Sequence, residues 1–145
     1  MNVIATPSVS MIAVCERVER EANGRLTLRS LIESVTVRPH GVASFVIVIG
    51  THGGELRGTA RWWITAVDPL GNSASEEMSA ITPLHGVVGT GDYAILDPVQ
   101  MRCPVEGVYW IDVSFAADTE APPASYPRRV LARRPMPVLF RQSGA

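Results

Sequence analysis

The chain has 145 residues, of which 46% are hydrophobic and 19% are charged. This composition is typical of a globular protein and excludes a disordered one, and the length predicts a single domain over residues 1–145. The net charge of −1 provides no global field that would attract nucleic acid or an anionic membrane.

The N-terminal region combines a short apolar stretch with an early charged residue, Glu16. No basic segment precedes the apolar stretch, so we predict neither a signal peptide nor a membrane-spanning helix. We therefore expect a cytoplasmic protein that does not contact a membrane. Val9–Cys15 is apolar at nearly every position and predicts a buried strand.

The charged residues of segment 16–21 have helical spacing, but Asn23-Gly24 directly after them is a strong hairpin signal. Alternating apolar and polar residues follow the glycine, which favours a turn leading into a strand over an exposed helix. The alternation then changes phase, and a bulge near Ser30 would explain the change. We expect the charged side chains to solvate this end and to pair with each other.

Further strands are predicted at regular intervals along the chain. Residues 42–49 are apolar on both faces and predict a central strand that is covered on both sides. Residues 56–67 and 107–118 alternate clearly, and residues 93–102 form a further candidate. These segments, separated by turn signals, are typical of a β-sandwich.

Two local sequence signals add a short helix and a C-terminal edge strand to this predicted pattern of strands. Ser73–Glu76 has the sequence of a capping box and predicts a short helix that ends near Ile81. A proline-rich loop near residues 121–127 precedes a basic C-terminal strand, in which Pro135 and Pro137 fit only an edge. The expected fold is therefore all-β: an antiparallel β-sandwich, immunoglobulin-like or related, with seven to eight strands and at most one short helix.

The cysteines and histidines provide no metal or cofactor site. Cys15 and Cys103 are too few for a disulfide framework and predict two buried thiols in a reducing compartment; a single bridge between neighbouring strands is the alternative. His40, His52 and His85 lie in predicted loops without metal-ligand spacing. We expect no metal and no cofactor.

The candidates for catalysis are few. The stretch HGVVGTGDY has the glycine spacing of a phosphate loop, but Asp92 stands where such a loop needs lysine. No serine lies in a nucleophile elbow. We therefore expect no enzyme, and we keep one alternative: a small-ligand-binding or hydrolytic domain with a loop site around His52, His85 and Asp92.

The arginines near the C-terminus suggest nucleic-acid binding at first, but their arrangement argues against it. Val130 and Leu131 separate the two arginine pairs at residues 128–129 and 133–134, and no aromatic residue is interleaved. Such residues more often protect an edge strand from pairing with another chain.

The tryptophans give the strongest hint of a binding surface. Alternation directs Trp63 and Trp110 away from the main core, with Arg57 and Arg61 on the same face as Trp63. Because tryptophan is enriched at interface anchors, we hypothesise that these four residues contact a protein partner or a second copy of the chain. The alternative is that a second buried face covers both tryptophans. The expected function is thus a non-enzymatic binding or assembly module.

Residues 11–37 resemble the opening of a bacterial family of uncharacterised proteins, a domain of unknown function. Its members begin with an apolar strand that ends in Cys, then a charged stretch, Asn-Gly-Lys/Arg and a second apolar strand. The matching positions are Cys15, Glu16, Val18, Arg20, Glu21, Asn23, Gly24, Leu26 and Leu28, whereas Arg29 and Ser30 replace the Ile/Val-Gly of the family. The stretches WWITAVDPLGN and EGVYWIDVSFAAD are similar to its middle and last strands. The resemblance implies a β-sandwich with no assigned activity.

A second resemblance concerns Gly107-Val108-Tyr109, which is similar to the Gly-x-Tyr of immunoglobulin-like sandwiches. There the tyrosine hydroxyl bonds back to the backbone across a corner. Val105 stands where those proteins have an acidic residue.

Overall fold

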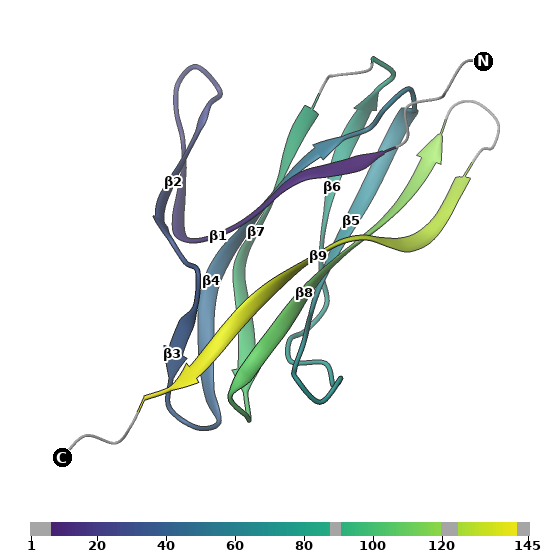
Figure 1. The fold of residues 1–145 in the computed structure, drawn as a ribbon. Helices are drawn as coiled ribbons and strands as arrows, with labels where there is room; N and C mark the ends of the chain where they lie inside the picture. Colours follow the sequence, from purple (N-terminus) through teal and green to yellow (C-terminus); the bar gives the residue numbers. More distant parts are fainter. Residues whose placement is uncertain (1–6, 88–90, 120–124, 142–145) are drawn as a thin grey trace.

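The computed structural model describes residues 7–87, 91–119 and 125–141, which form nine strands in two sheets packed face to face (Figure 1). The fold is therefore all-β and two-layered, as predicted, with nine strands instead of seven or eight. The first sheet has the order β2-β1-β4-β7 and contains β1 (Ser8–Arg20), β2 (Leu26–Leu31), β4 (Gly41–His52) and β7 (Gly91–Cys103).

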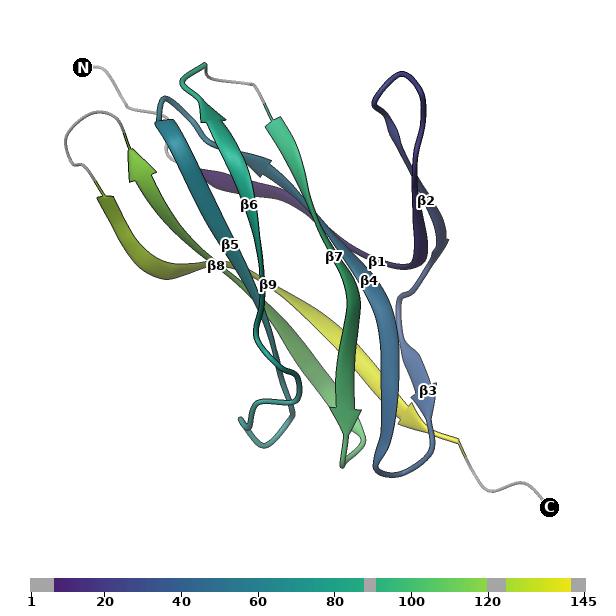
Figure 2. The same ribbon diagram turned by 180° about the vertical axis from the view of Figure 1, so that it is seen from behind.

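The second sheet has five strands in the order β3-β9-β8-β5-β6. They are β3 (Val35–Val37), β5 (Arg57–Val67), β6 (Met78–His85), β8 (Gly107–Thr119) and β9 (Ser125–Phe140). β1 and β9 lie along one open side of the sandwich in Figure 1, and β6 and β7 lie next to each other along the opposite side in Figure 2. The described residues contain no helix, and hence none long enough to cross a membrane.

Strand pairing is antiparallel with one exception, which corrects the purely antiparallel prediction. β3 pairs in parallel with the last three residues of β9, with Val35 opposite Val138. Before Val138, β9 pairs only with β8, so Pro135 and Pro137 lie where the strand is still an edge, as predicted. The proline-rich loop predicted near 121–127 lies largely outside the described residues.

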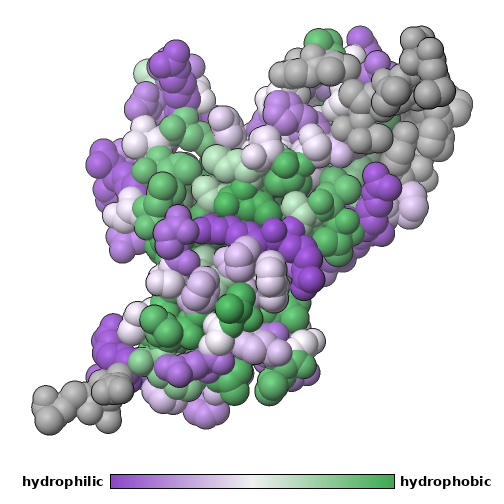
Figure 3. Space-filling view, viewed as in Figure 1, coloured by the Kyte–Doolittle hydropathy of each residue, from purple (hydrophilic) through white to green (hydrophobic). Residues whose placement is uncertain are grey.

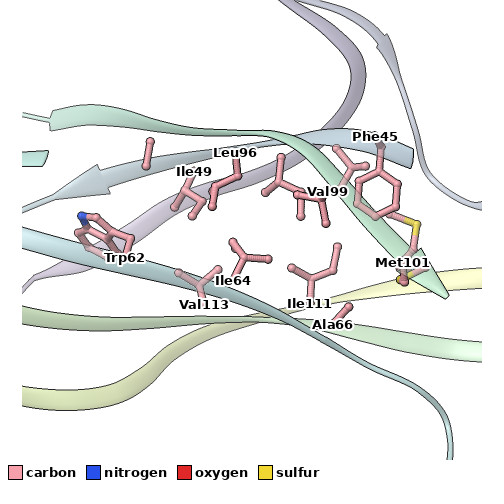
Figure 4. Close-up of a cluster of buried hydrophobic side chains, with 14 of the residues drawn as sticks. Phe45, Ile49, Trp62, Ile64, Ala66, Leu96, Val99, Met101, Ile111 and Val113 are labelled. Carbon is pink, nitrogen blue, oxygen red and sulfur yellow. The ribbon is translucent and has the colours of Figure 1, made fainter. Parts of the chain in front are cut away.

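The main core fills the space between the two sheets, because alternate side chains of each strand point inward. Trp62, Ile64 and Ile111 of the five-stranded sheet face residues of the other sheet that include Ile49 and Leu96 (Figure 4). All five are at most 2% exposed. Burial of each such side chain contributes about 1.5–3 kcal/mol to folding.

A second, smaller core lies on the outer face of the four-stranded sheet. Val46 and Val48 of β4 point away from the main core, yet they are buried together with Cys15. The β1–β2 hairpin packs its apolar residues against them, namely Val18, Leu26 and Leu28. The prediction of a strand covered on both sides is therefore confirmed, and the cover on one side is the hairpin.

The hairpin turn explains the Asn23-Gly24 signal. Gly24 has φ +82°, and its N–H donates to the carbonyl of Glu21 at 2.9 Å. A left-handed backbone is open to glycine at no steric cost, so the turn forms where this residue stands. On the strands, Glu19 pairs with Arg29 at 2.8 Å, and the hydroxyl of Thr27 donates to Glu21 at 2.6 Å. These exposed pairs contribute little to stability.

The bulge predicted near Ser30 is wrong. The pairing of β1 with β2 keeps one register from Arg20–Leu26 to Cys15–Leu31. Instead, Ser30 has φ +58°, and the chain leaves the first sheet after Leu31. The apolar pattern changes phase because Leu28 of β2 faces the second core, whereas Val35 and Val37 of β3, in the other sheet, pack against the main core.

The short helix predicted for residues 73–81 is also wrong. Ser73 forms a bridge with Val67, and the hydroxyl of Ser75 accepts the N–H of Ala66 at 3.0 Å. These contacts hold the segment in an extended conformation that leads into β6. The local capping signal is overridden because the serines bond to neighbouring strands.

Both cysteines are buried free thiols, as predicted, and no bridge joins them. Burial raises the pKa of Cys15 and of Cys103, so neither is activated as a nucleophile. The hydroxyl of Tyr109 donates to the carbonyl of Val105 at 2.7 Å, which is the bond that the Gly-x-Tyr pattern predicts. Burial also raises the pKa of Tyr109.

Candidate functional site

Neighbouring tryptophans of β5 have opposite environments. Trp62 is fully buried, packs on Phe115 at a centroid distance of 4.8 Å and donates from Nε1 to the hydroxyl of Thr82 at 2.8 Å. Trp63 lies on the outer face of the five-stranded sheet and is only half-buried, as is Trp110 of β8. The alternation therefore assigned both side chains to the correct face.

An arginine from β9 covers Trp63. The guanidinium carbon of Arg128 lies 4.3 Å from the centre of the Trp63 ring. The same guanidinium donates to both carboxylate oxygens of Glu77, with Nη1 at 3.0 Å from Oε1. This contact lowers the pKa of Glu77 and raises the pKa of Arg128. Strands β9 and β5 and the segment before β6 thus meet over one indole.

The same arrangement is repeated at the second tryptophan. The guanidinium carbon of Arg133 lies 5.0 Å from the centre of the Trp110 ring, and its Nε donates to Asp112 at 2.7 Å. Each indole therefore has an arginine held over it by a carboxylate. Stacked pairs of this kind fix both side chains and contribute about 0.5–1 kcal/mol at exposed sites.

Arg57 and Arg61 lie on the same outer face of β5 and are exposed. Arg61 donates from Nη1 to the hydroxyl of Ser79 at 2.9 Å. Arg57 lies opposite His85 and packs so closely on Gly86 that a side chain there would collide with it. The four residues predicted for partner binding therefore share one face of one sheet.

A groove of about 270 Å³ lies beside Trp63 on this face. Its lining includes Thr59, Arg61, Trp63, Ile81, Ala116 and Asp118. Ile81 is 60% exposed, which is high for an apolar side chain next to an aromatic ring. The groove thus combines apolar contact area with charged groups at its rim, which is the usual composition of a protein interface.

Sequence reasoning missed Glu77 and Asp112, and it assigned Arg128 and Arg133 only to edge protection. A signal existed for Asp112, which alternates with Trp110 on one face of the same strand. No signal existed for Glu77, because its contact with Arg128 joins residues 51 positions apart.

The structure brings together two of the three residues that we predicted for the alternative loop site. Nε2 of His85 lies 2.7 Å from a carboxylate oxygen of Asp92, and both side chains are partly exposed. The ring of His52 lies against Gly91, next to Asp92, without a hydrogen bond to either of the other two. The loop between β6 and β7 includes residues 88–90, which lie outside the described residues.

This pair can orient an imidazole for proton transfer. The nearby hydroxyl of Thr51 is buried and donates to the carbonyl of Asp92 at 3.1 Å, so it is occupied. Across the described parts of the chain, no three His, Cys, Asp or Glu side chains are grouped as metal ligands. The geometry thus provides a candidate base without an identified nucleophile.

Compared with known families, the chain matches no family model, and no curated protein is significantly similar to it.

Proposed function

We propose that this protein is a non-enzymatic binding or assembly module that contacts another protein, or a second copy of itself, through the outer face of its five-stranded sheet. The contact would centre on Trp63 and Trp110, with Arg57 and Arg61 at its border. The observation that carries the proposal is the pair of tryptophans held on one exposed face by carboxylate-bound arginines.

The physical support is the state of these side chains before binding. Aromatic and arginine side chains contribute most to interfaces when they are already ordered, because less conformational entropy is lost on binding. Arg128 and Arg133 are each fixed by a carboxylate, and the groove beside Trp63 has room for an apolar anchor from a partner.

We also propose that the chain is a single, immunoglobulin-like domain of a cytoplasmic bacterial protein related to the uncharacterised family described above. The support is the hairpin motif around Asn23-Gly24 and the bond from Tyr109 to Val105. Neither feature assigns an activity, since sandwiches serve many functions.

The test is size-exclusion chromatography with light scattering and pull-down from a bacterial lysate, using wild type, Trp63→Ala and a matched Val42→Ala control. Val42 is also exposed but lies on β4 of the other sheet. We expect Trp63→Ala to stay folded and to lose a dimer, or a specific retained protein whose binding is then measured with purified components. Unchanged mass and unchanged binding in Trp63→Ala would overturn the proposal.

The His85–Asp92 hydrogen bond favours a second candidate, a small-ligand-binding or hydrolytic site at the loop end of the sandwich. It predicts activity on a panel of simple esters and phosphate esters, lost in His85→Gln and in Asp92→Asn. Equal rates for wild type and both variants would exclude this candidate and leave the first unaffected.

A further inference from the structure

One stretch of the open side of the sandwich has an unpaired strand edge. β1 pairs with β4 through residues Ser8 to Cys15, but its other side meets β2 only from Cys15 onward. Just before that point, the carbonyl of Val14 accepts the N–H of Ile32 at 2.8 Å. Within residues 7–87, 91–119 and 125–141, no strand therefore pairs with the outer side of residues 8–13.

This edge differs from every other edge among the described residues. β9 carries Pro127, Pro135 and Pro137 with four arginines, β7 carries Pro98 with three charged residues, and β6 carries Pro83. β2 carries Arg29, and β3 has three residues only. Such features prevent a sheet from pairing with another chain. The sequence SVSMIA of residues 8–13 has neither proline nor charge, and its one irregularity is a bulge at Ser10.

Apolar side chains flank this edge on both faces of the strand. Val9 and Ile12 pack against the main core, Met11 and Ala13 pack against the second core, and all four keep partial exposure. Across the open side, Leu131 and Ala132 of β9 pack against the same main core and also keep partial exposure. Figure 3 shows hydrophobic surface on the open side that β1 and β9 border, with a band of hydrophilic side chains crossing its middle.

We infer that the β1 edge pairs with the β1 edge of a second copy of this chain, in antiparallel orientation, to form a sheet that continues across two subunits. Antiparallel partners place opposite residues on the same face. Because residues 8–13 are apolar on both faces and uncharged, two copies bring apolar groups together without charge repulsion. This edge carries no charge that would select a strand of opposite charge. A second copy of the chain supplies an uncharged strand of matching character.

The inference does not rest on the tryptophan face, which lies on the outside of the other sheet and would stay free in such a dimer. The two surfaces can therefore be tested separately. An edge dimer would present two copies of the Trp63 groove, so that a partner with two binding segments would be held by both.

The experiment uses the full chain in size-exclusion chromatography with light scattering over a hundredfold range of concentration. The edge variant is Ser8→Lys with Ser10→Lys, which adds charge at two exposed positions of β1. The control is Ser34→Lys with Thr36→Lys, which adds the same charge at exposed positions elsewhere. We expect a two-chain mass for wild type and control and a one-chain mass for the edge variant, with unchanged circular dichroism in all three.

Hydrogen exchange provides the second measurement and needs no variant. Peptides that cover residues 8–14 should exchange more slowly at high than at low protein concentration, and peptides from β5 and β8 should not change. A one-chain mass for wild type throughout, or a dimer unaffected by the edge lysines, would overturn the inference. A dimer lost in Trp63→Ala but kept in the edge variant would overturn it while supporting the tryptophan face as the site of self-association.

Discussion

The two sheets have outer faces that carry apolar residues for different reasons. On the four-stranded sheet, Val46 and Val48 are covered by the β1–β2 hairpin and have become a second core. On the five-stranded sheet, Trp63 and Trp110 are covered only by arginine side chains and keep part of their surface exposed. Apolar residues on an outer face therefore indicate binding only where no segment of the same chain buries them.

The strongest test of this comparison concerns the adjacent tryptophans of β5. Trp62→Ala removes a fully buried side chain with a ring contact to Phe115, and we expect it to lower the free energy of unfolding by about 3–5 kcal/mol. Trp63→Ala removes a half-buried ring, and its cost should stay below about 1.5 kcal/mol. Urea denaturation of both variants measures the difference, and equal losses would show that Trp63 is a core residue.

The second test concerns the core beneath the hairpin. Val48→Ala should cost about 2 kcal/mol, because Val48 of β4 is fully buried beneath the hairpin. Ile81→Ala, at an exposed position of the other outer face, should change the free energy of unfolding by no more than about 0.5 kcal/mol. A negligible effect of Val48→Ala in thermal or urea denaturation would mean that the hairpin does not cover this face in solution.

The third test alters the hairpin itself. Gly24→Ala forces a side chain into a left-handed turn position and should cost about 1–2 kcal/mol. Gly24→Asn should cost less, since asparagine tolerates this conformation better. Denaturation measures both losses, and equal stability of Gly24→Ala and wild type would contradict the turn geometry.

The smallest expected effect concerns the contact between Arg128 and Glu77. The pKa of Glu77 is lowered in the folded state, so the stabilisation is present above the ordinary glutamate pKa of about 4.3 and is lost as pH falls through the lowered value. Because the pair is exposed, the loss is at most about 1 kcal/mol. Tryptophan emission is followed in Trp110→Phe, where Trp62 and Trp63 remain and only Trp63 contacts the pair. This emission should change over the acidic range, and it should not change when Glu77→Gln is added to the same variant. An identical acid profile in both would contradict the contact.

The fold was predictable where the signal is local. Alternation assigned Trp62 to the core and Trp63 to the outer face, and Asn23-Gly24 marked the hairpin turn. It was not predictable where distant residues decide. The helix expected from Ser73 onward is replaced by bonds to β5, and the parallel pairing of β3 depends on a strand a hundred residues later.

The same distinction applies to the candidate site. Trp63, Trp110, Arg57 and Arg61 could be assigned to one face from strand periodicity alone. That Arg128 would lie over an indole of β5 could not, because the contact requires the order β9-β8-β5, which no local pattern encodes. The convergence of His85 and Asp92 likewise depends on how the loop between β6 and β7 closes.

The most direct test of the contrast between the two outer faces is hydroxyl-radical footprinting of the wild-type protein, read by mass spectrometry at single residues. Trp63 and Trp110 should be oxidised readily, whereas Trp62 should be protected, and Leu26 and Leu28, which the hairpin packs against the second core, should react slowly for their type. Equal oxidation of Trp62 and Trp63, or rapid labelling of both leucines, would contradict the proposed contrast.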